Sequence, residues 1–140
     1  MSVWRFFDYI TADGRNLMKD WYELQDEPVQ ARFDATLLIL AGLDDWEDES
    51  VEEFKPLTQN HIGLGEVRFH IEALAMGAKR THRRRFRPVG IWPTDTEHEF
   101  VLICGCEKIG RSLVPHGAFE TALLYKVDLK QGRGTISDHI

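Results

Sequence analysis

Positively charged side chains are concentrated in one part of the chain, and their chemistry suits phosphate. Six Lys and Arg residues lie among the nine positions 79–87, and two further cations, Lys108 and Arg111, follow an apolar run. The guanidinium group of arginine donates in a fixed fork that matches phosphate oxygens. Preorganised cations also stabilise the charge that develops in a transition state. These residue types indicate a site for an anionic partner.

Arg68 and His70 belong to a segment whose pattern predicts a strand. In residues 66–74 apolar and polar side chains alternate, which is typical of a half-buried strand. Arg68 and His70 are two residues apart and share its open face. A histidine can move protons near neutral pH, but the interpretation favoured for His70 is an exposed strand residue. Glu66 and Glu72 are expected to be salt-bridge partners rather than a catalytic pair.

The basic run leads directly into a second predicted strand at residues 86–92. Runs of like charge are usually solvated surface, but here part of the run must project from the sheet. Pro88 cannot donate a hydrogen bond to a neighbouring strand, which predicts a bulge or an unpaired position. Residues 100–106 are continuously apolar and predict a central strand covered on both faces, with Lys108 and Arg111 just beyond it.

The remaining segments predict a single α+β domain. Helical spacing of apolar residues, together with Asp26 and Pro28 as an N-terminal signal, predicts helices at 15–24, 26–41 and 115–129, after a first strand at 3–10. The order is β-α-α-β-β-β-α. We expect a small curved antiparallel sheet of about four strands with an N-terminal helical hairpin and a C-terminal helix. This domain would occupy residues 1–130, and 131–140 would form a flexible tail.

The charge is distributed unevenly along the chain. The net charge is −6 and the isoelectric point is about 5.5. Residues 1–55 carry 14 acidic and 5 basic side chains, whereas residues 56–140 carry 9 acidic and 12 basic ones. This split predicts an acidic layer and a basic layer, although the whole chain is not a typical nucleic-acid binder. The acidic window 44–53 is interpreted as a solvated loop anchored by Trp46. An alternative is that its carboxylates screen the basic face.

Other residue types favour few further functions. Cys104 and Cys106 are interpreted as two buried residues in a reducing cytoplasm, because their spacing fits neither a disulfide framework nor a zinc site. The six histidines are scattered, so neither a metal site nor a cofactor is expected. No apolar run approaches the ~18 residues of a membrane span, and the first residues lack the pattern of a secretory signal. We therefore expect a cytoplasmic protein.

The order and spacing of these segments carry a resemblance to a known family. The segments are GLGEVRF at 63–69, FRPVGIW at 86–92, FVLICGCEKIGR at 100–111, and a final helix with Pro115, Ala118 and Ala122. Together they resemble the RelE/ParE superfamily of bacterial toxins, and within it the HigB-like, phage-derived branch. The likeness extends from Trp4 to about Leu129. The individual motifs are loose, so the specificity lies in their order.

The resemblance implies a RelE-like fold and a role as the toxin of a type II toxin–antitoxin system. Such toxins are usually endoribonucleases that cut messenger RNA, often on the ribosome, and need no metal. The family pattern implies Arg68, Arg87 and Lys108 as catalytic residues, with Arg111 beside them; Arg85 and His70 are further candidates for binding RNA. The implied partners are messenger RNA, the ribosome and a cognate antitoxin, a helix-turn-helix protein from an adjacent gene. No membrane partner is expected.

Two alternatives stay open. One is a ParE-type toxin that binds DNA gyrase without catalysis, which would damage DNA and leave RNA uncut. The other is a phage-derived module that binds without nuclease activity, which the acidic isoelectric point favours. A shared fold would not decide between them, because function depends on the site. Arg87→Ala is expected to abolish toxicity and leave the fold intact, because an exposed strand charge contributes little stability.

Overall fold

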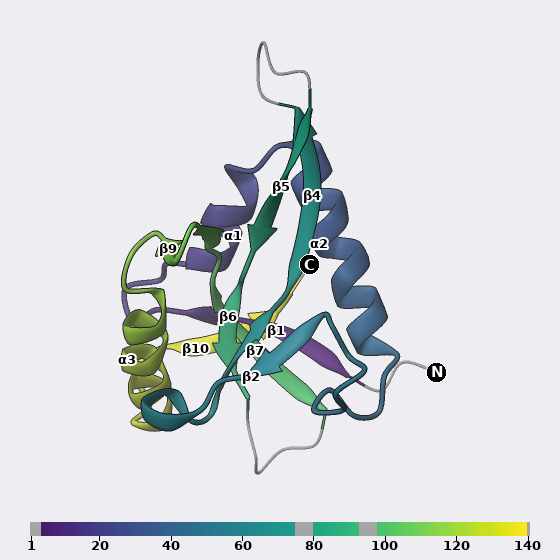
Figure 1. Cartoon of the computed structure of the whole chain (residues 1–140). Helices are drawn as coiled ribbons and strands as arrows, with labels where there is room; N and C mark the ends of the chain where they lie inside the picture. Colours follow the sequence, from purple (N-terminus) through teal and green to yellow (C-terminus); the bar gives the residue numbers. More distant parts are fainter. Residues whose placement is uncertain (1–3, 75–79, 93–97, 140) are drawn as a thin grey trace.

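The computed structural model describes residues 4–74, 80–92 and 98–139 (Figure 1). The described residues form three α-helices, one short 3-10 helix and ten strands in two sheets. The helices are α1 (Leu17–Glu23), α2 (Glu27–Ala41) and α3 (Ala118–Lys130), with the 3-10 helix at Gln59–His61. The strands are β1 (Arg5–Ile10), β2 (Phe54–Pro56), β3 (Leu64–Val67), β4 (Phe69–Leu74), β5 (Thr81–Phe86), β6 (Val89–Ile91), β7 (Glu99–Cys104), β8 (Glu107–Ile109), β9 (Ser112–Val114) and β10 (Thr135–Asp138).

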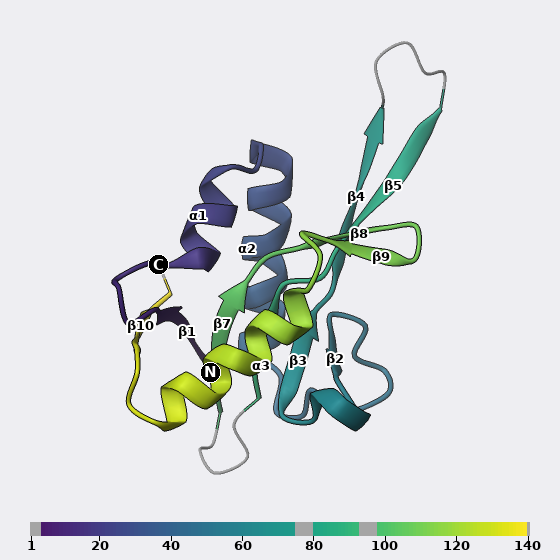
Figure 2. The ribbon, with the colours of Figure 1, turned by 90° about the vertical axis from the view of Figure 1, so that its left-hand side faces the viewer.

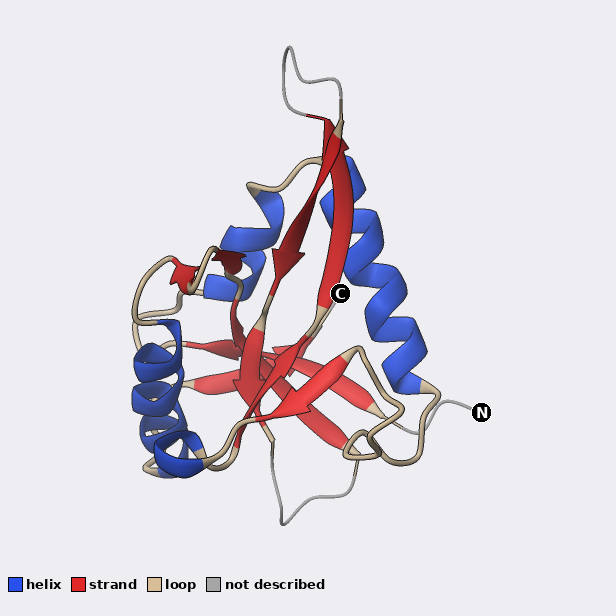
Figure 3. Ribbon diagram, in the orientation of Figure 1, coloured by secondary structure: helices blue, strands red, loops and turns tan. Residues whose placement is uncertain are grey.

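The larger sheet has six strands in the order β10-β1-β7-β6-β3-β2. β7 lies inside this sheet, and after Glu99 every residue of the strand is buried, as its continuous apolar sequence predicts. β1 runs parallel to β7, and the other neighbours pair antiparallel. Figure 3 shows these strands crossing the lower half of the molecule, with a second group of strands rising from them.

Three segments of the chain continue from the six-stranded sheet into a second sheet, β4-β5-β8-β9. They change sheets at Arg68, at Arg87–Pro88 and at Gly105–Cys106, and we call these residues the corner. The backbone N–H of Arg87 donates to the carbonyl of Cys106 at 2.8 Å, which ties two of the crossings together. Strands that switch sheets in this way make the bends of packed sheets.

Two local features explain the bend. The pairing of β6 with β7 shifts register between Val89 and Gly90, next to Pro88. A bulge increases local bending, and proline is tolerated at such positions because it lacks an N–H. A Cβ atom at Gly105 would collide with the ring of Trp21, so glycine lets α1 pack closely on the corner. The sequence predicts a bulge or an unpaired position at Pro88, and the observed shift in register begins one residue later, at Val89.

Helices cover both faces of the six-stranded sheet. The α1–α2 pair packs on one side through a core cluster that includes Phe33 and Leu40, and α3 packs on the other through Ala118 and Ala122. Figure 2 shows α1 and α2 together on one side and α3 apart from them. Asp26 is the N-cap of α2 and proline stands in its first turn, as the sequence predicts.

Trp46 fixes the acidic segment 44–53 to the core. Its ring stacks on Trp4, with 4.0 Å between centroids, and its Nε1–H donates to the carbonyl of Leu40 at 2.7 Å. Tryptophan combines a large apolar surface with one polar group that needs a partner when buried. The acidic side chains of this segment are exposed, apart from the half-buried Glu53. The interpretation of Trp46 as an anchor is therefore confirmed.

The prediction of a RelE-like fold with about four strands is wrong. The described residues contain ten strands in two sheets, so the protein is richer in sheet than that fold. Each of two segments interpreted as single strands, 66–74 and 86–92, is divided at the corner between two sheets. Most of the basic run forms β5, whereas Arg80 and Arg87 flank this strand. Lys79 and the start of the predicted first strand at 3–10 lie outside the described residues.

The C-terminal segment also differs from the expectation of a flexible tail at 131–140. Residues Thr135–Asp138 form β10, which pairs antiparallel with β1, and Tyr9 is opposite Ile136. The Tyr9 hydroxyl donates to the carbonyl of Arg133 at 3.1 Å. Residue 140 lies outside the described residues. The strand is held by backbone pairing rather than by burial, because all four of its residues are exposed.

Candidate functional site

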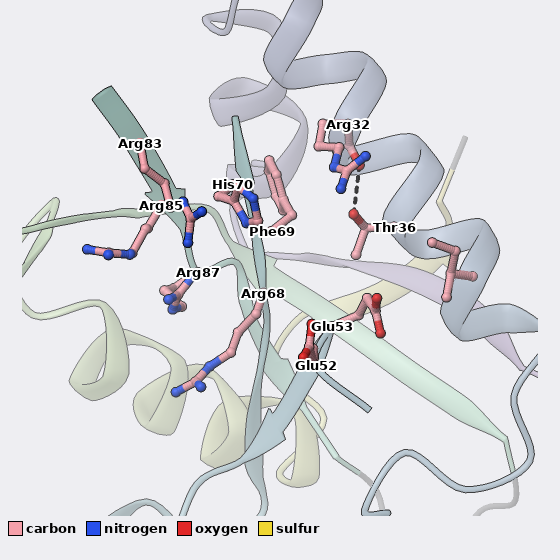
Figure 4. A pocket seen from close by; sticks show the side chains of 11 residues that line it. Arg32, Thr36, Glu52, Glu53, Arg68, Phe69, His70, Arg83, Arg85 and Arg87 are labelled. Carbon is pink, nitrogen blue, oxygen red and sulfur yellow. Dashed lines mark hydrogen bonds between the residues drawn. The ribbon is translucent and has the colours of Figure 1, made fainter. Parts of the chain in front are cut away.

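The two faces of the β4–β5 pair have different chemistry. Phe69 and Phe86 are opposite each other and their rings stack, with centroids 5.0 Å apart. Phe69 also contacts Phe33 of α2, so this face packs on the helices. His70 is opposite Arg85, and both residues stand on the other face because successive side chains alternate along a strand. Figure 4 shows the side chains that surround this region.

One row of cations and a histidine crosses three adjacent strands. Lys108 of β8 is opposite Arg85, and His70 of β4 is opposite Arg85 on its other side. Residues in such positions have Cβ atoms about 5 Å apart. We call the surface that carries His70, Arg83, Arg85 and Lys108 the basic face. Arg85 and Lys108 are exposed, and neither forms a salt bridge with a residue that the structure describes.

The row places two positive charges, Arg85 and Lys108, directly opposite each other, and like charges in such positions destabilise a sheet. A bound anion would remove that penalty, and two neighbouring cations aimed at one side of a sheet suit an anion with several oxygens. The row therefore satisfies the electrostatic requirement for a phosphate site more directly than an isolated arginine would.

Arg68 and Arg87 extend the basic face at the corner, where they share one carboxylate. Arg68 Nη2 lies 2.6 Å from Glu66 Oε1, and Arg87 Nε lies 3.9 Å from the same oxygen. The Glu66 side chain is only 7% exposed. A buried carboxylate needs a charged partner, so Arg68 has a structural role in addition to any role in binding.

Arg87 is held more tightly than the sequence predicts. Its side chain is 13% exposed, and Nη1 donates to the carbonyl of Phe86 at 2.8 Å. Burial lowers the pKa of Arg87, and the charges of Arg68 and Arg85 lower it further, while Glu66 opposes them. The expectation that Arg87 is an exposed strand charge is wrong. Replacing it would remove a hydrogen bond and alter a buried ion pair.

Glutamates neutralise other arginines around the row. Glu72 pairs with Arg83 at 3.3 Å on the basic face, and Glu107 pairs with Arg84 at 2.8 Å on the opposite face. The hydrogen bond to Glu107 raises the pKa of Arg84. The interpretation of Glu66 and Glu72 as salt-bridge partners is thus confirmed. Arg85 and Lys108 keep their charge available among these compensated arginines.

A groove of about 230 Å³ runs beside the basic face. Arg68, Arg85 and Arg87 line one wall, Arg32 and Thr36 of α2 line another, and Glu52 and Glu53 close one end (Figure 4). A second hollow beside Trp46 is lined by Arg68 and by the acidic residues 47–49 and 52. The acidic segment therefore borders the basic face at Arg68 without covering the row, which agrees in part with the screening alternative.

Comparison of this chain with protein families, with curated proteins and with solved structures gives no match. The resemblance to the RelE/ParE toxins consequently stays a prediction. Among the described residues no group of three or more His, Cys, Asp or Glu side chains is arranged to hold a metal ion. No helix in the described parts of the chain is long and apolar enough to cross a membrane.

The structure brings together most of the residues that the sequence singles out. His70, Arg85 and Lys108 form the row, and Arg68 and Arg87 lie at the corner below it. Arg111 stands in the turn between β8 and β9, outside the paired strands.

Sequence reasoning missed Arg32 and the role of Glu66 as the carboxylate shared by two arginines. An exposed arginine on a helix gives no signal of its own, so Arg32 could not have been found. The i, i+2 spacing of Glu66 and Arg68 was the available sign of their pairing.

Proposed function

We propose that the basic face binds RNA through its phosphates and cleaves it without a metal ion. The observation that carries this proposal is the row of His70, Arg85 and Lys108 on three adjacent strands, with no carboxylate paired to either cation among the described residues. The row offers a proton acceptor, a phosphate-binding fork and a proton donor in that order. These are the three groups that cleavage by a neighbouring hydroxyl requires.

The order of the groups suggests their roles. A phosphate seated over Arg85 would lie between His70 and Lys108, whose Cβ atoms are each about 5 Å from that of Arg85. His70 would remove the proton of the 2′-hydroxyl, whose oxygen then attacks phosphorus. Lys108 would protonate the 5′-oxygen as its bond to phosphorus breaks. The products would be a 2′,3′-cyclic phosphate and a 5′-hydroxyl end, with Arg85 and Arg68 stabilising the charge on the pentacoordinate phosphate.

The resemblance supplies a biological context for this activity. A toxin of a type II toxin–antitoxin system, with messenger RNA as its substrate and a helix-turn-helix antitoxin from an adjacent gene, would use such a face. The support for this context is the order of the sequence motifs, and the activity proposed for the row does not depend on it.

The test is cleavage of a labelled single-stranded RNA in the presence of EDTA, with analysis of the product ends. We expect 2′,3′-cyclic phosphate ends, and no cleavage of DNA of the same sequence because it lacks the 2′-hydroxyl. His70→Ala should abolish cleavage with little effect on binding, whereas Arg85→Ala should weaken both. Arg15→Ala, which removes an exposed arginine outside the grooves of this face, is the matched control. Full activity of His70→Ala would contradict the role of His70.

A second candidate is binding without cleavage. Two observations favour it: Arg68 and Arg87 are engaged by Glu66, and the net charge of −6 opposes general RNA affinity. The same assay separates the two candidates. Binding that depends on Arg85, with intact RNA after long incubation, would establish the binding module and exclude the nuclease.

A further inference from the structure

The outer edge of β4 has no partner strand in the described part of the chain. β4 is the terminal strand of its sheet and pairs only with β5. Just before β4, on the same outer side, the backbone N–H of Arg68 donates to the carbonyl of Glu53 at 2.7 Å, immediately before β2 begins. In an antiparallel pair every second residue turns its N–H and C=O away from the partner. β4 therefore offers hydrogen-bonding groups along the six residues Phe69–Leu74.

A hollow of about 490 Å³ lies along this edge, between β4 and α2. Its helical wall is made of small exposed residues, Ala31 and Ala35, with Pro28 at one end. Arg32 and His70 line both this hollow and the groove of the basic face, so the two hollows adjoin. Ile39, 48% exposed and one helical turn beyond Ala35, lines the adjoining groove.

We propose that this edge accepts an extended segment of a partner protein as an added β-strand, and that the segment alternates apolar and acidic residues. A strand added to β4 would turn one set of side chains toward α2 and the other toward the basic face. The α2 side offers Ala31, Ala35 and Ile39, which suit apolar side chains. The other side offers His70 and Arg85, which suit carboxylates.

The charges beside β4 favour an acidic peptide strand over two other possible occupants of this edge, a second copy of the chain and RNA. Arg32 stands at the rim of the hollow and has no salt bridge with a described residue, so it can receive a carboxylate from the added strand. Pairing of β4 with β4 of a second copy would bring no new carboxylate to Arg32 or Arg85, because the one carboxylate in β4, Glu72, already pairs with Arg83. RNA could reach the basic face, but it would not use the backbone groups of a strand edge or the apolar wall of α2.

The test uses a labelled synthetic peptide of about eight residues that alternates valine and glutamate, long enough to span β4. A peptide of the same length that alternates valine and lysine is its control. We expect the acidic peptide to bind by fluorescence anisotropy and to slow hydrogen exchange at alternate amides of β4. Ala35→Trp fills the hollow from an exposed helical position, and Arg32→Glu reverses the rim charge. Each should weaken binding at least about tenfold.

Arg15→Glu, an exposed charge reversal elsewhere, should leave peptide affinity unchanged. If Ala35→Trp does not fold, Ala31→Trp replaces it, because Ala31 lines the same hollow. Unaltered affinity of these variants, together with loss of binding in Arg85→Ala, would mean that the peptide binds as a polyanion on the basic face and would overturn the proposal. A dimer of the free chain that the peptide cannot dissociate would also overturn it. Absence of RNA cleavage would not affect this result.

Discussion

The salt dependence of RNA binding gives the sharpest test of the basic face. Each cation that neutralises a phosphate of a single strand contributes about −0.7 to the slope of log K against log salt. Arg85 and Lys108 have no carboxylate partner among the described residues, so each is expected to contribute one full phosphate contact. Arg68 and Arg87 share Glu66, so together they are expected to contribute at most one phosphate contact. Two to three contacts predict a slope of about −1.4 to −2.1.

This slope translates into a modest and measurable change in affinity. Between about 50 and 200 mM salt the dissociation constant should rise about 7- to 18-fold. Arg85→Ala removes one full contact, so its slope should be shallower by about 0.7 and its affinity should fall only about 3- to 7-fold over the same range. Arg85 is exposed and has no ion pair with a described residue, so this substitution should change the free energy of unfolding by about 0.5 kcal/mol or less.

Fluorescence anisotropy with a 2′-O-methyl RNA, which cannot be cleaved through its 2′-oxygen, measures these slopes. Arg15→Ala controls for the loss of an arginine outside the basic face and should keep the wild-type slope. A wild-type slope steeper than about −4 would mean that cations beyond the row and the corner dominate. An unchanged slope in Arg85→Ala would refute the placement of a phosphate over the row.

Three further predictions concern the corner, α1 and the thiols. Arg68→Ala leaves the buried carboxylate of Glu66 without its closest cation, so it should destabilise the fold by about 2–4 kcal/mol in urea unfolding. Adding Glu66→Gln should restore part of this loss. If the effects of the two substitutions simply add, Arg68 and Glu66 are not energetically coupled and the prediction is refuted. Burial and the hydrogen bond to Asp34 raise the pKa of Tyr22 to about 12. Because the folded-state pKa lies above the ordinary value near 10, this interaction stabilises the fold below about pH 10 and is lost as the pH rises through about 12; Asp34→Asn should lower the pKa in an ultraviolet titration, and an unmoved pKa would contradict this cause. Burial raises the pKa of Cys106, so a thiol reagent at pH 8 should label it only after denaturation; rapid labelling of the native chain would contradict its burial.

The sequence predicts elements whose signals are local. The apolar run of β7 and the N-terminal signals of α2 lie within the elements that they specify, and both elements form. β10 has no such signal, because its residues are exposed and its pairing with β1 joins positions more than a hundred residues apart. Non-local pairing of a short polar strand leaves no periodicity in the sequence.

The corner shows why strand patterns alone mislead about sheets. Alternation of polar and apolar residues continues from β3 into β4 through Arg68, because both sheets bury the same side of the segment. Periodicity reports which side of a strand is buried, and it does not report which neighbours the strand pairs with. For the same reason the alternation correctly places Glu66 and Arg68 on one side of the segment, where they can pair, but it gives no sign that Glu66 is shared with Arg87.

The acidic half of the chain has a physical consequence for the basic face. A net charge of −6 repels nucleic acid at long range, and salt screens that repulsion beyond about 10 Å at 0.1 M. RNA that reaches the row meets Arg85 and Lys108, which form no ion pair with a described residue, while Glu52 and Glu53 line the groove beside the face. Long-range repulsion with short-range attraction lowers non-specific affinity more than affinity at the row. The acidic segment is thus expected to weaken RNA binding overall but to increase the preference for binding at the row over non-specific binding. Trp46 holds the segment in the position where it has this effect.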